Sequence, residues 1–293
     1  MTELSCIHAF ERDLSPASAL ATALGVPVRT VALHRFPDGE SLVRSTTEDA
    51  RPVLYCRLDH PNERLIEALL AADALGGKPV LVAPYLPYMR QDIAFHPGEA
   101  VSQRVVSRLL GGAVSALVTV APHLHRTATL DPLIAPARAI VIPAADVLAP
   151  LLRDEAADRP VLVGPDGESA PALLRLVELT GFEALHLTKT RSGDREVAAT
   201  LPPGTALEGR RAVLIDDICS TGTTLTEAAR LLYAAGAGSV EAIVIHPLFD
   251  AAAASRLRAA GIRRIRATDS VAHDAGRIPL APFLAAALRE CLP

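Results

Sequence analysis

The chain has 293 residues, of which half are hydrophobic and 21% are charged. This composition excludes an intrinsically disordered chain and leaves enough apolar surface for two domains of ordinary size. The formal charge of −4 excludes a general basic field for nucleic acid, so any anion must be bound locally. No apolar run approaches the length of about 18 residues that a membrane span needs, no signal-peptide pattern opens the chain, and the four cysteines form no CxxC pair. We therefore expect a cytoplasmic protein that binds neither nucleic acid nor membranes.

Short β-rich runs alternate with amphipathic helical stretches along the sequence, a pattern that predicts an α/β fold with mainly parallel sheets flanked by helices. The strands predicted in the first half are Val28–Phe36, Ser41–Ser45, Pro52–Leu58, Pro79–Ala83 and Ala116–Ala121. The helices predicted there are Glu63–Leu75, capped by Asn62, and Glu99–Leu110, which the glycine pair 111–112 is expected to end.

The second half repeats the same alternation. Its predicted strands are Pro160–Gly164, Ala184–Thr188, Arg211–Ile215, Val240–His246 and Ile265–Ala267. Its predicted helices are Ala170–Thr180, Thr223–Ala235, Asp250–Ala260 and Leu280–Leu292. A stretch rich in proline and alanine, residues 131–150, lies between the halves, and we place the domain boundary there, giving domains 1–145 and 146–293.

The most specific motif lies between the predicted strand at 211–215 and the predicted helix at 223–235. Two carboxylates, Asp216 and Asp217, are followed by hydroxyl side chains around a glycine, at Ser220, Thr221, Gly222, Thr223 and Thr224. A helix N-terminus preceded by such a loop is suited to bind a phosphate, and paired carboxylates can accept hydrogen bonds from sugar hydroxyls. A simple helix cap would explain one acidic residue and one hydroxyl, but not the whole set.

This motif resembles the phosphoribosyl diphosphate (PRPP) binding loop of the type I phosphoribosyltransferase superfamily. The resemblance implies that Asp216 and Asp217 hold the ribose 2′ and 3′ hydroxyls, and that the segment Ser220–Thr224 holds the 5′-phosphate.

Two motifs in the first half have the chemistry of nucleotide contacts. The Asp-Gly pair within Arg35–Glu40 favours a hairpin with Phe36 near its tip, either as an adenine-stacking face or as a small core filler. Arg90 offers a planar fork for a phosphate or a purine face, while Gln91 and Asp92 can read an adenine edge or a ribose. As an isolated motif, this second segment is equally compatible with a solvated loop.

Six motifs occur in order along the chain: Arg35–Glu40, Arg90–Ser102, His123–His125, Pro165–Ser169, Lys189–Arg191 and Asp216–Thr224. In this order the chain is similar to ribose-phosphate pyrophosphokinases, especially the shorter archaeal-type enzymes. The resemblance implies two tandem phosphoribosyltransferase-like domains, each a mainly parallel sheet flanked by helices. It also implies ATP and ribose 5-phosphate as substrates, Mg²⁺ as cofactor, and a homo-oligomer (dimer or higher) in which the hairpin at Arg35–Glu40 reaches a neighbouring subunit's ATP.

The resemblance also assigns site residues. The residues implied for ATP are Phe36, Asp38, Glu40, Arg90, Gln91, Asp92 and His125. His125 and Asp166 are implied as Mg²⁺ ligands, and Lys189 and Arg191 as catalytic cations that stabilise the transferring diphosphoryl group. The chain departs from the family pattern at His123, where aspartate is common, and at Glu168, where a further glycine is usual.

The implied reaction transfers the β,γ-diphosphoryl group of Mg-ATP to the 1-hydroxyl of ribose 5-phosphate, giving PRPP and AMP. Two alternatives stay open. A phosphoribosyltransferase that consumes PRPP would not require ATP, and Arg90–Asp92 together with Lys189 and Arg191 argue against it. A non-catalytic regulatory homologue is kept open by the departures at His123 and Glu168.

Overall fold

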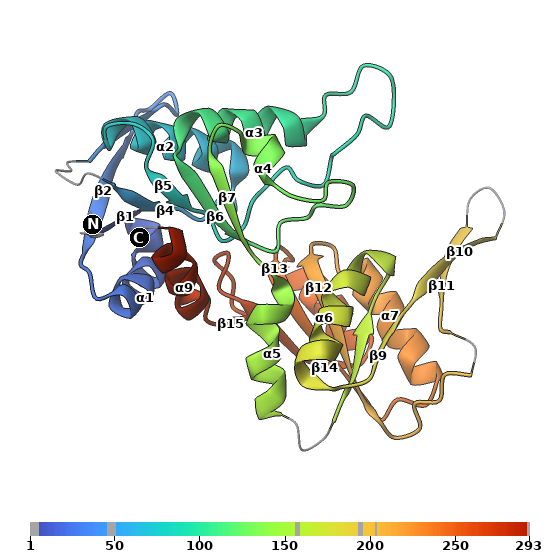
Figure 1. The fold of residues 1–293 in the computed structure, drawn as a ribbon. Coiled ribbons are helices and arrows are strands. Elements are labelled where there is room, and N and C mark those ends of the chain that lie inside the picture. The colour runs from blue at the N-terminus through green and yellow to red at the C-terminus, as the bar shows by residue number, and fades with distance from the viewer. Residues whose placement is uncertain (1–5, 46–50, 156–158, 193–195, 203, 292–293) are drawn as a thin grey trace. The chain divides into compact units, whose positions relative to one another are not determined.

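Two sheets organise the chain (Figure 1). The computed structural model describes residues 6–45, 51–155, 159–192, 196–202 and 204–291, with the backbone alone at 189–192, 196–199 and 291. Contacts divide the chain into two units. Unit 1 contains Met1–Ile142, Ser270–Ala272 and Pro279–Pro293, and unit 2 contains Pro143–Asp269 and His273–Ile278.

The unit 1 sheet has the strand order β3-β2-β1-β4-β5-β6-β7. Its strands are β1 (Ile7–Phe10), β2 (Val28–Arg35), β3 (Ser41–Arg44), β4 (Val53–Tyr55), β5 (Val80–Val82), β6 (Ala116–Val120) and β7 (Arg138–Ile142). Neighbouring strands are parallel except β2 and β3, which form an antiparallel hairpin. Every residue of β4, β5 and β6 is buried, as expected for central strands covered on both faces.

Helices cover both faces of this sheet (Figure 1). On one face lie α2 (Pro61–Ala74), α3 (Ser102–Ala113) and α4 (Asp131–Ile134), and on the other lie α1 (Leu14–Leu24), preceded by the short helix η1 (Glu11–Asp13), and α9 (Ala281–Cys291). Helix α9 packs against α1, β6 and β7, and the Arg289 guanidinium donates a hydrogen bond to the Ala23 carbonyl oxygen at 2.5 Å.

Unit 2 has the strand order β15-β14-β13-β12-β8-β9, with all neighbours parallel. Its strands are β8 (Val161–Gly164), β9 (Ala184–His186), β12 (Arg211–Cys219), β13 (Ser239–Pro247), β14 (Ile262–Thr268) and β15 (Gly276–Ile278). Its helices are α5 (Ala144–Asp154), η3 (Gly167–Ser169), α6 (Ala170–Thr180), α7 (Thr223–Ala234) and α8 (Ala251–Ala259). A separate antiparallel ribbon, β10 (Thr188–Ser192) with β11 (Glu196–Thr200), stands away from this sheet (Figure 1).

The predicted fold class, with two mainly parallel sheets flanked by helices, is confirmed. Two local predictions in unit 1 are wrong. Helix α3 does not run from Glu99 to Leu110 but from Ser102 to Ala113. A side chain at Gly111 would collide with the Ile134 carbonyl oxygen, so this glycine permits the close approach of α4. Asn62 does not cap α2, which begins at Pro61, but accepts a hydrogen bond from the Tyr88 hydroxyl.

The stretch 131–150, expected to separate the domains, is instead regular structure that carries α4, β7 and α5. The boundary predicted from the sequence lies at residue 145, whereas contacts divide the chain between Ile142 and Pro143. Residues 279–293, which the sequence analysis assigns to the second domain, belong to unit 1, because the buried side of α9 packs on α1 and on the sheet of that unit.

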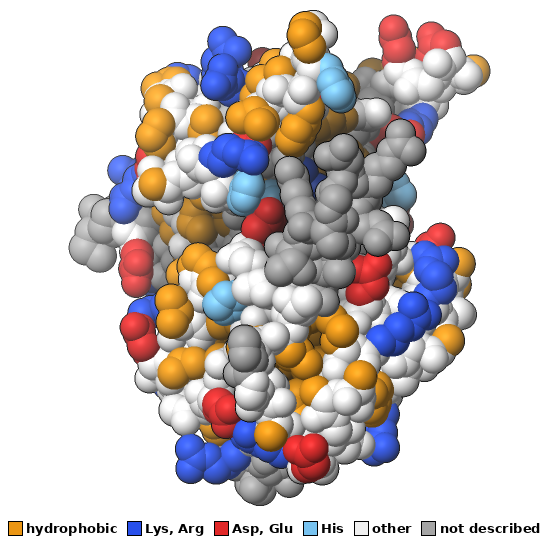
Figure 2. All heavy atoms as spheres, turned by 90° about the vertical axis from the view of Figure 1, so that its right-hand side faces the viewer, with side chains coloured by type: hydrophobic (Ala, Val, Ile, Leu, Met, Phe, Trp, Pro, Cys, Tyr) orange, Lys and Arg blue, Asp and Glu red, His pale blue; other side chains and the backbone are white. Residues whose placement is uncertain are grey.

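Among the described residues that are visible in Figure 2, Lys and Arg side chains are interspersed with Asp and Glu side chains. Within the described part of the chain, no helix combines the length and the apolar character that crossing a membrane requires.

Candidate active site

Three carboxylates gather at the carboxyl edge of the unit 2 sheet. Strands β8 and β12 are parallel neighbours with Val163 opposite Leu214, so the segment that follows β8 and the last residues of β12 reach the same edge. Asp166 lies just after β8, while Asp216 and Asp217 lie on β12 itself, which is longer than predicted and ends at Cys219. The predicted pair and the predicted Mg²⁺ ligand therefore lie at one edge of one sheet.

The surroundings of this cluster change the pKa of Asp216. Burial raises the pKa of Asp216 well above its usual value, and the neighbouring negative charges of Asp217 and Asp166 raise this pKa further. Asp217 accepts a hydrogen bond from the Ile218 backbone N–H at 2.7 Å, which fixes its carboxylate beside the strand end. Like charges held this close together are typical of a site that receives a cation or hydroxyl donors from a ligand.

The predicted phosphate loop follows this cluster directly. Gly222 is the N-cap residue of α7, its φ of 74° is in the left-handed region, and the Thr221 hydroxyl accepts a hydrogen bond from the Thr223 N–H, the first of the helix, at 3.5 Å. The Thr221 and Thr223 hydroxyls are 3.1 Å apart at the same turn. The loop therefore places hydroxyl groups next to a helix N-terminus, an arrangement that suits an anion.

Helix α8 supports this loop, a role that the sequence analysis missed. A side chain at Gly222 would come within 3.2 Å of the Leu257 side chain, and the Arg256 guanidinium donates a hydrogen bond to the Thr221 carbonyl oxygen at 2.8 Å. Both contacts join residues about 35 positions apart in the sequence. The pattern of α8 alone does not indicate them.

Lys189 and Arg191 lie on β10, where they are paired with Ala199 and Val197 of β11. The sequence predicts a polar loop here, but the backbone forms a two-stranded ribbon. The two side chains lie outside the described part of the structure, so the common orientation of the two cations stays a prediction.

In unit 1, the predicted hairpin is confirmed. The turn between β2 and β3 is closed by hydrogen bonds from the Phe36 N–H to the Glu40 carbonyl and from the Gly39 N–H to the Phe36 carbonyl, both at 2.9 Å. The Asp38 carboxylate accepts a hydrogen bond from the Glu40 N–H at 3.1 Å. Phe36 is 40% exposed and contacts the His34 ring edge-on, so it is not a core residue.

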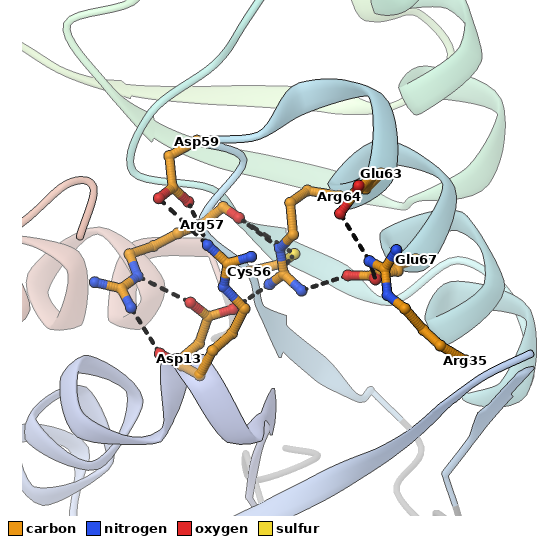
Figure 3. A network of polar contacts seen from close by, with 9 residues as sticks. Asp13, Arg35, Cys56, Arg57, Asp59, Glu63, Arg64 and Glu67 are labelled. Atoms are coloured by element: carbon orange, nitrogen blue, oxygen red, sulfur yellow. Dashed lines mark hydrogen bonds and ion pairs between the residues drawn. The ribbon is translucent and has the colours of Figure 1, made fainter. Parts of the chain in front are cut away.

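An ion network with a buried centre joins the turn end of this hairpin to helix α2 (Figure 3). Arg64, which is fully buried, lies between Asp13 and Glu67 and donates to both, at 2.6 Å in the case of Glu67. The other oxygen of Glu67 accepts a hydrogen bond from Arg35, the last residue of β2, also at 2.6 Å. The hairpin that presents Phe36 is thus tied to buried charges.

The network continues on the other side of Arg64. Arg57 donates to Asp13 at 2.8 Å, and the Cys56 thiol lies 3.1 Å from the Arg64 guanidinium (Figure 3). Burial raises the pKa of Cys56 to about 12 despite the opposing effect of Arg64. Cys56 therefore stays a neutral thiol and serves as a weak acceptor rather than as a nucleophile.

The segment Arg90–Asp92 follows β5, and His123 and His125 follow β6, its parallel neighbour. Arg90 is exposed, whereas the side chain of Gln91 accepts a hydrogen bond from the Ser102 hydroxyl at 2.6 Å. The rings of His123 and His125 lie nearly parallel, 6.4 Å apart, as expected from their alternation along an extended chain.

Asp92 has different surroundings from those that the sequence analysis envisages. Its side chain is 2% exposed and is bound to Arg126 at 2.7 Å. Asp92 therefore already forms an ion pair with Arg126, a residue that lies outside the predicted motifs.

The side chains of the site can be compared with the ligands that the implied Mg²⁺ prefers. In the described part of the chain, no group of three or more His, Cys, Asp or Glu side chains is arranged to hold a metal by itself. Mg²⁺ is commonly bound through one or two carboxylates together with waters and substrate phosphates, and it prefers oxygen to nitrogen. The carboxylates at the unit 2 edge, including Asp166, fit such an ion, whereas the imidazole of His125 fits a phosphate oxygen better.

Two family models match the chain. The model of the N-terminal domain of ribose phosphate pyrophosphokinase covers residues 6–113, and the model of the phosphoribosyl transferase domain covers residues 134–273. The chain is also similar to a ribose-phosphate pyrophosphokinase of Methanopyrus kandleri, with 38% identity over 92% of this chain and 94% of that protein. A protein of the same name from Methanosarcina acetivorans is 35% identical over 94% and 95% of the two chains.

Among solved structures, that of phosphoribosylpyrophosphate synthetase from Mycobacterium smegmatis superimposes with a TM-score of 0.82 at 25% identity. The match covers 98% of this chain and 99% of that one, so the similarity includes both units and the α9 segment. With matching models in both halves and relatives that are similar over nearly their whole length, the chain belongs to the ribose-phosphate pyrophosphokinase family of enzymes.

Proposed function

We propose that this protein is a ribose-phosphate diphosphokinase, which transfers the β,γ-diphosphoryl group of Mg-ATP to ribose 5-phosphate. In this reaction the 1-hydroxyl oxygen of the sugar forms a bond to the β-phosphorus of ATP, and the bond from that phosphorus to the bridging oxygen of AMP breaks. The hydroxyl proton passes to solvent, and AMP and PRPP are released. This transfer requires mainly positioning and charge stabilisation.

The observation that carries this proposal is the acidic pair next to the N-terminus of α7 in unit 2. Asp216 and Asp217 lie at the end of β12, and Gly222 opens α7 after a hydroxyl-rich turn. A sugar phosphate presents both complementary groups, vicinal hydroxyls and a dianionic phosphate. We assign the sugar hydroxyls to Asp216 and Asp217. We assign the phosphate to the loop formed by Ser220, Thr221, Gly222, Thr223 and Thr224.

We assign ATP to the carboxyl edge of unit 1. The exposed side chain of Arg90 suits the purine face or a phosphate, and Gln91 suits a polar edge of the nucleotide. His125 has an exposed imidazole on the segment that follows β6 and suits a phosphate oxygen. The hairpin residues Phe36, Asp38 and Glu40, which would reach this site from a neighbouring subunit, complete the proposed set.

Mg²⁺ bound by Asp166 and by phosphate oxygens would neutralise charge on the transferring group. Lys189 and Arg191 are the proposed catalytic cations, and they would stabilise the charge that develops on the diphosphoryl group. Asp216, whose pKa is raised, is expected to bind the sugar hydroxyls better as Mg²⁺ reduces the repulsion within the cluster.

A direct assay tests the proposal. The purified protein is incubated with Mg²⁺, ribose 5-phosphate and ATP radiolabelled at the β-phosphorus. We expect AMP and labelled PRPP to appear in equal amounts. Formation of ADP and phosphate alone would contradict the proposal, and so would a PRPP-consuming reaction that needs no ATP. A protein that binds ATP without turnover would support the regulatory alternative.

We also propose a homo-oligomer (dimer or higher). The hairpin exposes apolar side chains at Leu33, Phe36 and Leu42, which are 38%, 40% and 48% exposed. Burial against a second copy would remove this apolar surface from water. Light scattering on the wild type and on Phe36→Ser tests this proposal, and a monomeric wild type at assay concentration would contradict it.

A further inference from the structure

The ion pair between Asp92 and Arg126 connects two segments of the proposed ATP edge. Asp92 lies on the segment that follows β5, and Arg126 lies on the segment that follows β6, one residue after His125. Because β5 and β6 are parallel neighbours, both segments leave the sheet at its carboxyl edge. The Arg126 Nη1 atom donates to the Asp92 Oδ1 atom at 2.7 Å.

The two partners differ in exposure. The Asp92 side chain is 2% exposed, while that of Arg126 is 46% exposed. The second carboxylate oxygen of Asp92 is buried and has no hydrogen-bond partner in the described part of the chain. Burying a carboxylate with only one of its oxygens paired is costly, and an ion pair with one half-exposed partner returns little stability. The pair is therefore poorly explained as a stabilising contact.

The segment that precedes Asp92 is held by hydrogen bonds to the start of α3. The residue before Asp92, Gln91, accepts the Ser102 hydroxyl through its side chain and the Gln103 N–H through its carbonyl, at 2.6 Å and 3.2 Å. Gln103 also donates to the Met89 carbonyl at 3.4 Å. The start of α3 thus holds the backbone on both sides of Arg90, and Asp92, the residue after Gln91, offers Arg126 an acceptor next to this hydrogen-bonded segment.

We propose that Arg126 is an additional residue that binds the ATP phosphates, and that Asp92 acts through it as a positioning residue instead of contacting adenine or ribose. This inference rests on the proposed function. A guanidinium has five donors in one plane, and its bond to Asp92 leaves further donors for an anion. Holding it in place beforehand lowers the entropy cost of binding the polyphosphate.

The test is a double-mutant cycle with two probes, ATP and adenosine, whose affinities are measured by calorimetry on the full-length protein. Arg126→Gln should weaken ATP binding about 10- to 100-fold, as expected for the loss of a charge-assisted hydrogen bond, and should leave adenosine binding unchanged. Asp92→Asn should weaken ATP binding less, and should have no further effect in the Arg126→Gln background. The KM for ribose 5-phosphate should not change.

Two further variants control the experiment. Arg108→Gln removes an exposed arginine of α3 and should bind ATP like the wild type. The double variant Asp92→Asn with Arg126→Gln leaves no buried carboxylate without a partner, so it tests ATP binding even if Arg126→Gln alone is unstable.

Three results would overturn the inference: additive effects of the two substitutions, an equal loss of adenosine affinity, or wild-type ATP affinity in Arg126→Gln and in the double variant. The wild-type assay separates this inference from the proposed function. An active wild type with an additive cycle rejects the positioning role of Asp92, and an active wild type with unchanged ATP affinity in Arg126→Gln and in the double variant rejects the role of Arg126; neither result rejects the proposed reaction. A non-additive cycle specific for ATP in a wild type that makes no PRPP rejects only the proposed reaction.

Discussion

Buried carboxylates are paired with arginines at the carboxyl edge of the unit 1 sheet, whereas carboxylates lie next to one another at the carboxyl edge of the unit 2 sheet. In unit 1, the buried carboxylates Asp13 and Glu67 each bind arginine side chains, with Arg64 shared between them. In unit 2, burial raises the pKa of Asp216, and the negative charges of Asp217 and Asp166 raise it further. Paired opposite charges hold a structure in place, whereas like charges gathered at a strand end need a ligand to relieve them. The contrast separates the supporting residues from those proposed to bind the sugar phosphate.

The paired edge should respond most strongly to a change that removes its shared cation. Arg64→Met leaves Asp13 and Glu67 buried without their common partner, and we expect a loss of about 3–5 kcal/mol in the free energy of unfolding. Burial already raises the pKa of Asp13 despite its arginine neighbours. Chemical denaturation measures the loss. Glu63→Gln, at a side chain that is 58% exposed, is the control and should cost less than about 1 kcal/mol.

A second prediction concerns the cations proposed to act in the same reaction as the carboxylates of unit 2. Lys189→Ala should lower kcat by about 10²–10³, the usual effect of losing one charge-stabilising donor, while the KM values for ATP and ribose 5-phosphate change little. Steady-state kinetics at saturating substrates measure it. A kcat within a few-fold of the wild type would remove this residue from the mechanism.

The carboxylates themselves should affect binding more than turnover. Asp217→Ala or Asp216→Ala should weaken ribose 5-phosphate binding by about 1.5–3 kcal/mol, the contribution of a hydrogen bond to a charged group, and leave ATP binding largely intact. Calorimetric titration with each substrate distinguishes the two effects. An equal loss of ATP affinity in both variants would contradict the division of substrates between the units.

The smallest effect concerns pH and stability. Because the folded-state pKa of Asp216 is raised, ionisation of this group costs stability as the pH rises through that pKa, and the cost is absent below the unfolded value of about 4. Asp216→Asn should therefore raise the Tm near neutral pH and above, by roughly 2–4 °C for each kcal/mol relieved, and the gain should vanish in acid. Calorimetry across pH measures it, and a gain that is independent of pH would show that ionisation of Asp216 is not its cause.

Much of the fold follows from local patterns. The predicted limits of α6 agree with the structure at both ends, and the sequence indicates Asp216, Asp217 and Gly222 because strand, carboxylates and helix start follow one another. Contacts between distant residues left no such signal. Arg64 and Asp13 are 51 residues apart, and an arginine is normally expected at the surface.

The candidate site shows the same limit. The sequence indicates that Asp92 is polar and follows a strand, but not that Arg126, 34 residues later, occupies its carboxylate. Likewise, Arg256 reaches the phosphate loop only because α8 packs beside it. Sequence motifs therefore indicate the candidate site residues, whereas the contacts that support these residues depend on tertiary structure.

The return of α9 to unit 1 determines how this chain can be made and divided. Residues 281–291 cover α1, β6 and β7, which leave the ribosome more than a hundred residues earlier. During synthesis, the first unit therefore keeps part of its core exposed until the second has been translated. A gene fragment that stops at residue 142 would encode a sheet with one incompletely covered face, whereas a circular permutant that joins α9 directly to β1 would let each unit fold from a continuous stretch of chain.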